Sequence, residues 1–171
     1  MAGKSSRLKK PQFSINQLIN DVLHLLTSYQ SNKKRRMISK MSHVSVYVLD
    51  QNSAYDFYVN KLGFQVKTDA PMGEEGRWLT VAPPDQSDLE ITLMPIAEGM
   101  LFNQDTASQM RNLVKNGTFG FGVFECKDIY ATYEELTAKG VEFSKKPTKE
   151  FYGIEAVFKD DSGNWFSLGQ K

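Results

Sequence analysis

Cysteine and histidine are the scarcest reactive residues of this sequence. Cys126 is the only cysteine, so neither an internal disulfide nor a metal site built from several cysteines can form. One cysteine fits the reducing cytoplasm, where we expect the protein to lie, and Cys126 is expected to be a small core residue. The two histidines are His24 and His43. Because only His43 lies beyond residue 42, residues 43–170 cannot supply an iron site with two histidines and one carboxylate.

The sequence also lacks the apolar run of about 18 residues that a membrane-spanning helix needs. It contains no phosphate-binding P-loop, no dinucleotide-binding glycine pattern and no serine-nucleophile elbow. Acidic residues are rare at its start: residues 1–42 carry nine Lys or Arg and only Asp21, a net charge of +8, whereas the remainder carries −7. An acidic body argues against a nucleic-acid groove, so we expect no nucleic-acid partner.

The residues that follow position 42 repeat one pattern of elements. In each copy an apolar strand precedes a helical pattern that ends at a glycine, and a second apolar strand follows. These segments are 43–48, 54–62 and 64–66 in the first copy and 119–124, 129–139 and 141–143 in the second. Gly63 and Gly140 stand where a helix C-terminus favours positive φ. Two such half-units, each too small to close its own core, are expected to pack on each other.

Further short apolar runs complete each copy. They cover 77–82 and 89–94 in the first copy and 153–159 and 164–169 in the second. Between the last two runs, Asp160, Ser162, Gly163 and Asn164 supply the turn residues of a hairpin. Each copy is therefore predicted to be βαβββ, with half-units 43–95 and 117–170, a linker helix within 99–116 and an α+β fold. Residues 43–170 form the predicted domain, and residues 1–42 a basic helical extension.

Several short motifs follow one another along this domain. They are Phe57-Tyr58 in the first helix, Leu62-Gly63-Phe64 and Lys139-Gly140-Val141 after the two helices, and the segment 160–168, DDSGNWFSL. In this order the motifs resemble the vicinal oxygen chelate superfamily of glyoxalases, bleomycin-resistance proteins and extradiol dioxygenases. The resemblance implies tandem half-units that form a partly open, barrel-like groove of mixed sheets. It leaves the activity open, because the superfamily uses one scaffold for several chemistries.

The resemblance also implies where a metal would bind. Metal-using relatives place one ligand on each of four strands, and His43 and Glu90 match two of these positions. Phe121 and Ser167 occupy the other two. Two protein ligands hold a divalent ion poorly. We therefore expect no tightly bound cofactor, with a weak divalent metal site at His43 and Glu90 as the alternative. A substitute ligand would have to come from a carboxylate on a shifted strand, either Glu125 or Glu155.

Side-chain alternation along the strands indicates which residues line the groove. In the second copy it places Phe121, Val123 and Glu125 there. Aromatic rings bind planar or cationic ligands, and a few convergent polar groups orient them. The predicted ligand-binding residues are His43, Tyr47, Trp78, Glu90, Phe121, Tyr152 and Trp165. The pair His43 and Glu90 either orients a ligand or satisfies its own buried polar groups.

Together these features predict a homodimeric small-molecule-binding protein with a groove that is metal-free or weakly metal-binding. A metal-dependent lyase or isomerase of the glyoxalase type, using His43 and Glu90, is the alternative. A non-enzymatic regulatory or interaction protein is a second alternative. The sequence leaves open whether any reaction, glyoxalase-like or dioxygenase-like, is catalysed.

The extension contains an amphipathic pattern between two basic clusters. Apolar residues recur at three- and four-residue spacing, and Ser14 with Gln17 forms a capping-box pattern. A helix is therefore predicted from about Ser14 to Tyr29. Four roles stay open: an arm that docks on this domain or on a partner, a membrane contact at an anionic surface, a targeting peptide, or a segment that contributes little.

Overall fold

The computed structural model describes residues 14–31, 38–72, 76–99 and 101–170. The chain divides into two compact units, Met1–Lys40 and Met41–Lys171. The first unit contains α1 (Ile15–Ser31), which confirms the predicted N-terminal helix. Ser14 begins this helix, because its hydroxyl accepts the N–H of Asn16 at 3.2 Å. Among the described helices, none is long and apolar enough to cross a membrane.

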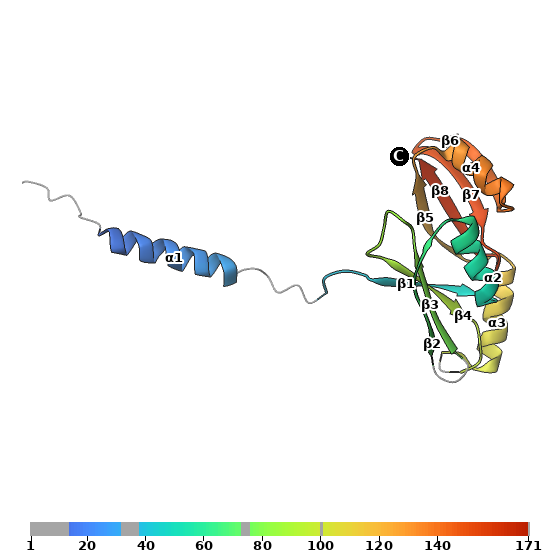
Figure 1. Cartoon of the computed structure of the whole chain (residues 1–171), viewed down its shortest axis with the longest axis horizontal. Helices are drawn as coiled ribbons and strands as arrows, with labels where there is room; N and C mark the ends of the chain where they lie inside the picture. The colour runs from blue at the N-terminus through green and yellow to red at the C-terminus, as the bar shows by residue number, and fades with distance from the viewer. Residues whose placement is uncertain (1–13, 32–37, 73–75, 100, 171) are drawn as a thin grey trace, which may run out of the picture. The chain divides into compact units, whose positions relative to one another are not determined.

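The second unit consists of two four-stranded mixed sheets with their helices (Figure 1). Sheet A has the order β1-β4-β3-β2 and sheet B the order β5-β8-β7-β6. In each sheet the first and last strands of the half-unit pair in parallel and the other pairs are antiparallel. This arrangement confirms the α+β fold and its tandem βαβββ half-units. The elements are β1 (His43–Val48), α2 (Gln51–Tyr55), η1 (Asp56–Lys61), β2 (Gln65–Met72), β3 (Gly76–Ala82), β4 (Glu90–Pro95), α3 (Gln104–Lys115), β5 (Gly120–Cys126), α4 (Ile129–Ala138), β6 (Glu142–Glu150), β7 (Gly153–Lys159) and β8 (Trp165–Gln170).

The helix of each half-unit begins at an aspartate and ends before a glycine. Asp50 accepts backbone N–H groups at the start of α2, and Asp128 does the same for α4. Gly63 and Gly140 have φ of 75° and 77°, which confirms the predicted left-handed positions. The first helix starts earlier than predicted because Asp50 caps it, and it continues as the π-helix η1.

Two strands are much longer than their apolar patterns indicated. β2 was expected over 64–66 and runs Gln65–Met72, and β6 was expected over 141–143 and runs Glu142–Glu150. Both are sheet-edge strands with mostly exposed or half-exposed side chains, held by antiparallel pairing with β3 and β7. Pairing through backbone groups needs no apolar residues, so hydrophobicity did not reveal these strands.

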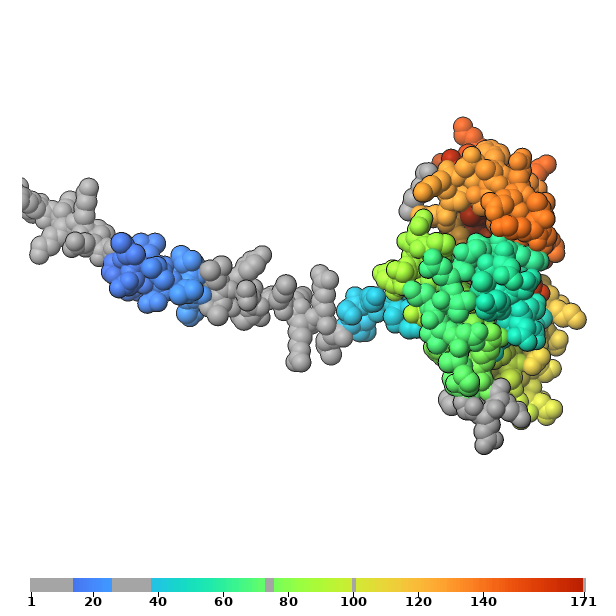
Figure 2. Space-filling model, viewed as in Figure 1, coloured from blue at the N-terminus to red at the C-terminus, as the bar shows by residue number. Residues whose placement is uncertain are grey.

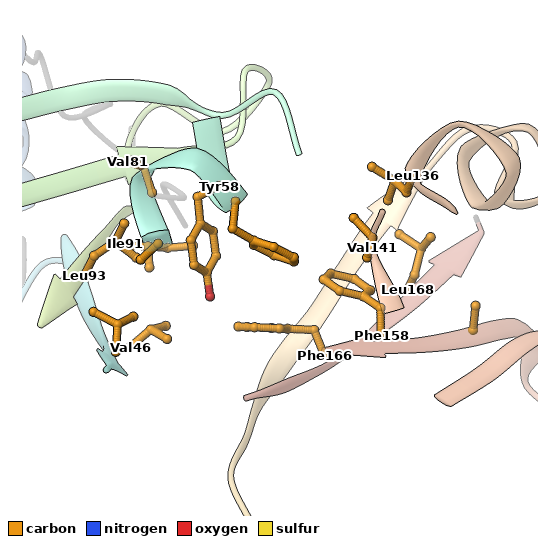
Figure 3. Packing of buried hydrophobic residues seen from close by; sticks show 14 of the residues in the cluster. Val46, Tyr58, Val81, Ile91, Leu93, Leu136, Val141, Phe158, Phe166 and Leu168 are labelled. Atoms are coloured by element: carbon orange, nitrogen blue, oxygen red, sulfur yellow. The ribbon is translucent and has the colours of Figure 1, made fainter. Parts of the chain in front are cut away.

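One hydrophobic core joins the two half-units. Figure 3 shows Tyr58 of the first half on the side of its sheet that faces Phe158 and Phe166 of the second. Tyr58 and Phe158 are 0% and 1% exposed, and the rings of Tyr58 and Phe166 meet edge-on at 6.3 Å. Phe64 and Phe124 form a second edge-on pair across the halves at 5.3 Å. Neither sheet closes a core alone, as the internal repeat predicted.

The β7–β8 hairpin turn, residues 160–164, ties the second half-unit to the first. Asp160 accepts the hydroxyl of Tyr58 at 2.9 Å, and its other oxygen accepts three backbone N–H groups of its own turn. The Asn164 amide donates to the carbonyl of Tyr47, and the Ser162 hydroxyl accepts the N–H of Leu49. Burial raises the pKa of Asp160 above its ordinary value, mainly because the charged form loses water. Hydrogen bonds from this turn therefore hold the second half-unit to the first.

Candidate functional site

Strand alternation divides the side chains of sheet A between two faces. Val46, Val48 and Leu93 point into the core, where their exposed fractions are at most 1%. Their neighbours His43 on β1 and Glu90 on β4 occupy the opposite face, which we call the outer face of sheet A. β1 and β4 pair in parallel, and their register sets His43 directly beside Glu90. The backbone therefore brings together the two residues that the family pattern singled out.

The His43–Glu90 pair is anchored to its own sheet. His43 Nε2 lies 3.5 Å from Glu90 Oε2, and the Thr80 hydroxyl donates to the same carboxylate oxygen at 2.6 Å. The Ser42 hydroxyl lies 2.9 Å from His43 Nδ1, and the Trp78 ring centre lies 6.2 Å from that of His43. The His43 side chain is 44% exposed and that of Glu90 is 24% exposed. An imidazole, a carboxylate and an indole thus stand together at an accessible surface.

Tyr47 lies on the same face of β1 but is engaged by the linker. Its ring meets that of Phe102 edge-on at 5.6 Å. Tyr47 packs with Phe102 and Met110 on a small cluster around Ile96 and Val114, where α3 covers this end of sheet A. Its surroundings are those of a packed residue, and its predicted contact with a ligand stays a prediction.

The outer face of sheet B differs from the sequence pattern at Phe121. The register between β5 and β8 shifts between Gly120 and Gly122, a β-bulge that breaks the period-two alternation. Phe121 therefore packs against the core, 6.2 Å from Phe166, instead of pointing into a groove with Val123. This differs from the orientation expected for Phe121, but the side chain is only half-buried and its predicted contact with a ligand stays a prediction. Val123 is 68% exposed.

Trp165 lies on sheet B at the start of β8, above a glycine. It pairs with Gly120, and a Cβ atom at Gly120 would lie 2.1 Å from the Trp165 ring. The indole therefore packs directly on the backbone of Gly120, where any side chain would clash with it. Trp165 remains 39% exposed. The glycine was visible in the sequence, but its contact with Trp165 depends on the register.

A polar network centred on Glu155 crosses sheet B. The carboxylate accepts the hydroxyl of Ser167 at 2.8 Å and of Tyr152 at 3.0 Å, and Lys145 donates to it at 2.8 Å. Lys145 also donates to Glu150 at 2.6 Å. The contacts with Lys145 and Ser167 lower the pKa of Glu155, and hydrogen bonds to Glu150 and Glu155 raise that of Lys145. Sequence reasoning missed Lys145 and Glu150, because the polar half of β6 gave no strand signal.

A cavity of about 1000 Å³ opens between the loop after β3 and the segment that joins β5 to α4. Figure 2 shows the sheet A half, cyan to green, beside the sheet B half, orange. The cavity lining includes Pro84, Cys126 and Asp128, together with Val123 and Glu125, which strand alternation had placed in the groove. None of the seven predicted ligand-binding residues is among the described residues that line it. Asp128 already caps α4, and burial raises the pKa of the Cys126 thiol. The Cys126 thiol is therefore poorly suited to attack a ligand, and Asp128 is already engaged by the backbone of α4.

Comparison with known proteins identifies the family. Residues 40–168 match the model of the Glyoxalase/Bleomycin resistance protein/Dioxygenase superfamily. The chain belongs to this superfamily. The protein YetH of Bacillus subtilis (strain 168) is 38% identical over 132 residues, which are 77% of this chain and 98% of YetH.

Two solved structures of similar proteins have the same fold. The crystal structure of UcmS2 is 45% identical in sequence with a TM-score of 0.74, and the match covers 78% of this chain and 98% of UcmS2. TnmS3, described as an antibiotic binding protein from Streptomyces sp. CB03234, is 30% identical with a TM-score of 0.62, covering 80% of this chain and 98% of TnmS3.

Members of the superfamily often bind metals, but the residues of this chain do not fit a divalent ion well. His43 and Glu90 offer two donors on sheet A, whereas the Phe121 side chain has no donor atom and packs against the core, and Ser167 donates its hydroxyl to Glu155. Of the two substitute ligands considered, Glu125 and Glu155, the second already pairs with Lys145 at 2.8 Å. Within the described residues, no group of three His, Cys, Asp or Glu side chains could hold a metal ion. Two donors fall short of the three that a catalytic ion usually keeps.

Proposed function

We propose that this protein binds a planar aromatic small molecule without covalent chemistry and without a tightly held metal. The observation that carries the proposal is the position of the two tryptophans. Trp78 stands beside His43 and Glu90 on sheet A, and Trp165 lies over Gly120 on sheet B. Trp165 is 39% exposed and Trp78 is half-buried, and accessible indole rings next to oriented polar groups suit a flat ligand with hydrogen-bonding edges. The description of TnmS3 as antibiotic-binding supports this function.

The ligand site in this proposal lies between two copies of the chain in a homodimer. The two sheets share one core, so their outer faces both look away from it. The sheet B half also exposes Val123, Phe151 and Tyr152, by 68%, 99% and 60%. Exposed apolar groups of this kind are commonly covered by a second subunit. A second copy would place sheet A of one chain over sheet B of the other and enclose a ligand.

Tryptophan fluorescence tests this proposal directly, because the chain has only two tryptophans and both stand at the proposed site. Titration with bleomycin and with a flat anthracycline should give saturable quenching for at least one of them. The variants Trp78→Phe and Trp165→Phe should each lose part of the signal and bind more weakly. Glu90→Gln should weaken binding about tenfold, the equivalent of one hydrogen bond to a charged group.

The matched control for these variants is Tyr130→Phe, an exposed aromatic residue on α4. It should leave the affinity unchanged. Saturable binding that is indifferent to Trp78, Trp165 and Glu90 would contradict the proposed site. It would instead direct attention to the cavity near Cys126.

A metal-dependent lyase or isomerase of the glyoxalase type is the second candidate. The observation in its favour is the accessible His43–Glu90 pair, with 3.5 Å between Nε2 and Oε2. This function requires activity toward the hemithioacetal of glutathione and methylglyoxal that depends on added Ni²⁺ or Zn²⁺. The activity should disappear in His43→Ala. Metal-dependent turnover lost in that variant would favour the enzyme over the binding protein.

A further inference from the structure

Helix α1 presents an exposed apolar face that takes no part in the proposed ligand site. Ile15, Leu18, Ile19 and Val22 are 76%, 56%, 51% and 49% exposed. Their spacing of three and four residues sets them on one side of the helix. Large aliphatic side chains on one exposed helix face lower their free energy when a surface covers them.

The charges on and around α1 indicate what kind of surface could cover its apolar face. Within Ile15–Ser31 there is no Lys or Arg, and Asp21 is the only acidic residue. The basic residues of the extension instead flank the helix in sequence, at 4–10, at 33–36 and at Lys40, and give residues 1–42 a net charge of +8. The rest of the chain carries −7. An anionic surface would attract the helix from both sides while repelling the remainder of the protein.

From these two features we propose that α1 binds the surface of a membrane rich in anionic phospholipids, lying parallel to it with its apolar face among the acyl chains. The basic flanks would then contact lipid headgroups. A second copy of α1 fits less well, because two aligned copies would bring like-charged flanks together. The apolar face also includes Ile19 beside the 15, 18, 22 series, which is wider than the seam of a two-stranded coiled coil. This inference is independent of the small-molecule site.

Vesicle flotation with the full-length chain tests the proposal. We expect binding to vesicles of phosphatidylcholine with about 30% phosphatidylglycerol and little binding to pure phosphatidylcholine, since each basic residue near an anionic surface strengthens attraction. Val22→Asp places a charge on the apolar face and should weaken binding at least tenfold. Asn20→Asp adds the same charge on the polar face and should weaken it less than threefold. Replacing 33–36 with glutamine should reduce binding to the anionic vesicles.

Each other result overturns the proposal. Absence of binding to anionic vesicles at millimolar lipid excludes a lipid surface. If Val22→Asp and Asn20→Asp weaken vesicle binding equally, the basic flanks alone bind the vesicle surface and the apolar face of α1 does not insert. Self-association without lipid that Val22→Asp abolishes would identify a second copy as the occupant. Circular dichroism of both variants in buffer shows whether α1 still forms.

Discussion

At the scale of single residues, the hydrogen bond from Tyr58 to Asp160 links two half-units that are far apart in sequence. Both groups are buried, and the bond is 2.9 Å long. Burial and then the charge of Asp160 raise the pKa of Tyr58 well above its ordinary value, so the phenol stays a donor. Tyr58→Phe removes the donor and keeps the ring.

We expect Tyr58→Phe to lower the free energy of unfolding by about 1–3 kcal/mol, the usual effect of leaving a buried partner without its bond. Urea denaturation measures the change. Tyr130→Phe, on a ring that is 54% exposed, is the matched control and should change stability by no more than about 0.5 kcal/mol. Equal effects of the two changes would show that the buried bond contributes nothing.

The Glu155 network makes the stability of the domain depend on pH in the acid range. Lys145 and then Ser167 lower the pKa of Glu155 below its ordinary value of 4.5. A carboxyl group with a lowered folded-state pKa stabilises the fold above its unfolded pKa, and this contribution disappears as the pH falls through the folded value. Glu155→Gln should therefore reduce stability near neutral pH and flatten its decline below pH 4.5.

Thermal melts from neutral pH to about pH 3 measure this flattening through the slope of stability against pH. Glu142→Gln, an exposed carboxyl on the same sheet, is the control and should leave the slope unchanged. A wild-type slope in Glu155→Gln would mean that its contacts with Lys145 and Ser167 do not persist in solution.

At the scale of elements, the bulge in β5 positions Trp165 through the glycine beneath it. A Cβ at Gly120 would lie 2.1 Å from the indole, whereas a Cβ at Gly122 would meet nothing within 4 Å. Gly120→Ala should therefore displace Trp165, lower stability by about 1–3 kcal/mol through overpacking, and shift its fluorescence. Gly122→Ala is the matched control and should do neither. If Gly120→Ala leaves the emission unchanged, Trp165 does not rest on this glycine.

Elements that bury one face were predictable from the sequence. β1, β7 and α4 lie within a residue of their predicted bounds, because each alternates apolar and polar residues or follows a capping aspartate. β2 and β6 were underestimated, because backbone pairing at a sheet edge leaves no apolar pattern. Phe121 was misplaced for a related reason: a bulge changes which face a side chain occupies without changing the composition of the strand.

The candidate site was predictable only where sequence motif and strand pairing coincide. His43 and Glu90 were singled out by the family pattern, and the parallel register of β1 and β4 sets them together. Glu155 entered only as a substitute metal ligand. Its contact with Lys145 depends on a register shift between β6 and β7, which no residue pattern in the sequence predicts. Polar networks across strands therefore need the structure, since each member alone resembles a solvated surface residue.

At the scale of the whole molecule, the two compact units should behave independently in folding. Both half-units and the shared core belong to Met41–Lys171. A variant that begins at Met41 should therefore melt within a few degrees of the full chain and keep its ligand binding. Calorimetry and the fluorescence titration check both properties. An insoluble or molten shortened protein would show that residues 1–40 complete the core.

We propose that this superfamily member binds its ligand without a resident divalent ion. The most direct test of this proposal is the metal content of the full-length protein purified without chelator, measured by mass spectrometry. Because His43 and Glu90 are two donors where a catalytic ion usually keeps three, we expect far less than one ion per chain and an affinity no tighter than roughly micromolar. One Ni²⁺, Mn²⁺ or Zn²⁺ per chain, lost in His43→Ala, would contradict the account and favour the metal-dependent enzyme.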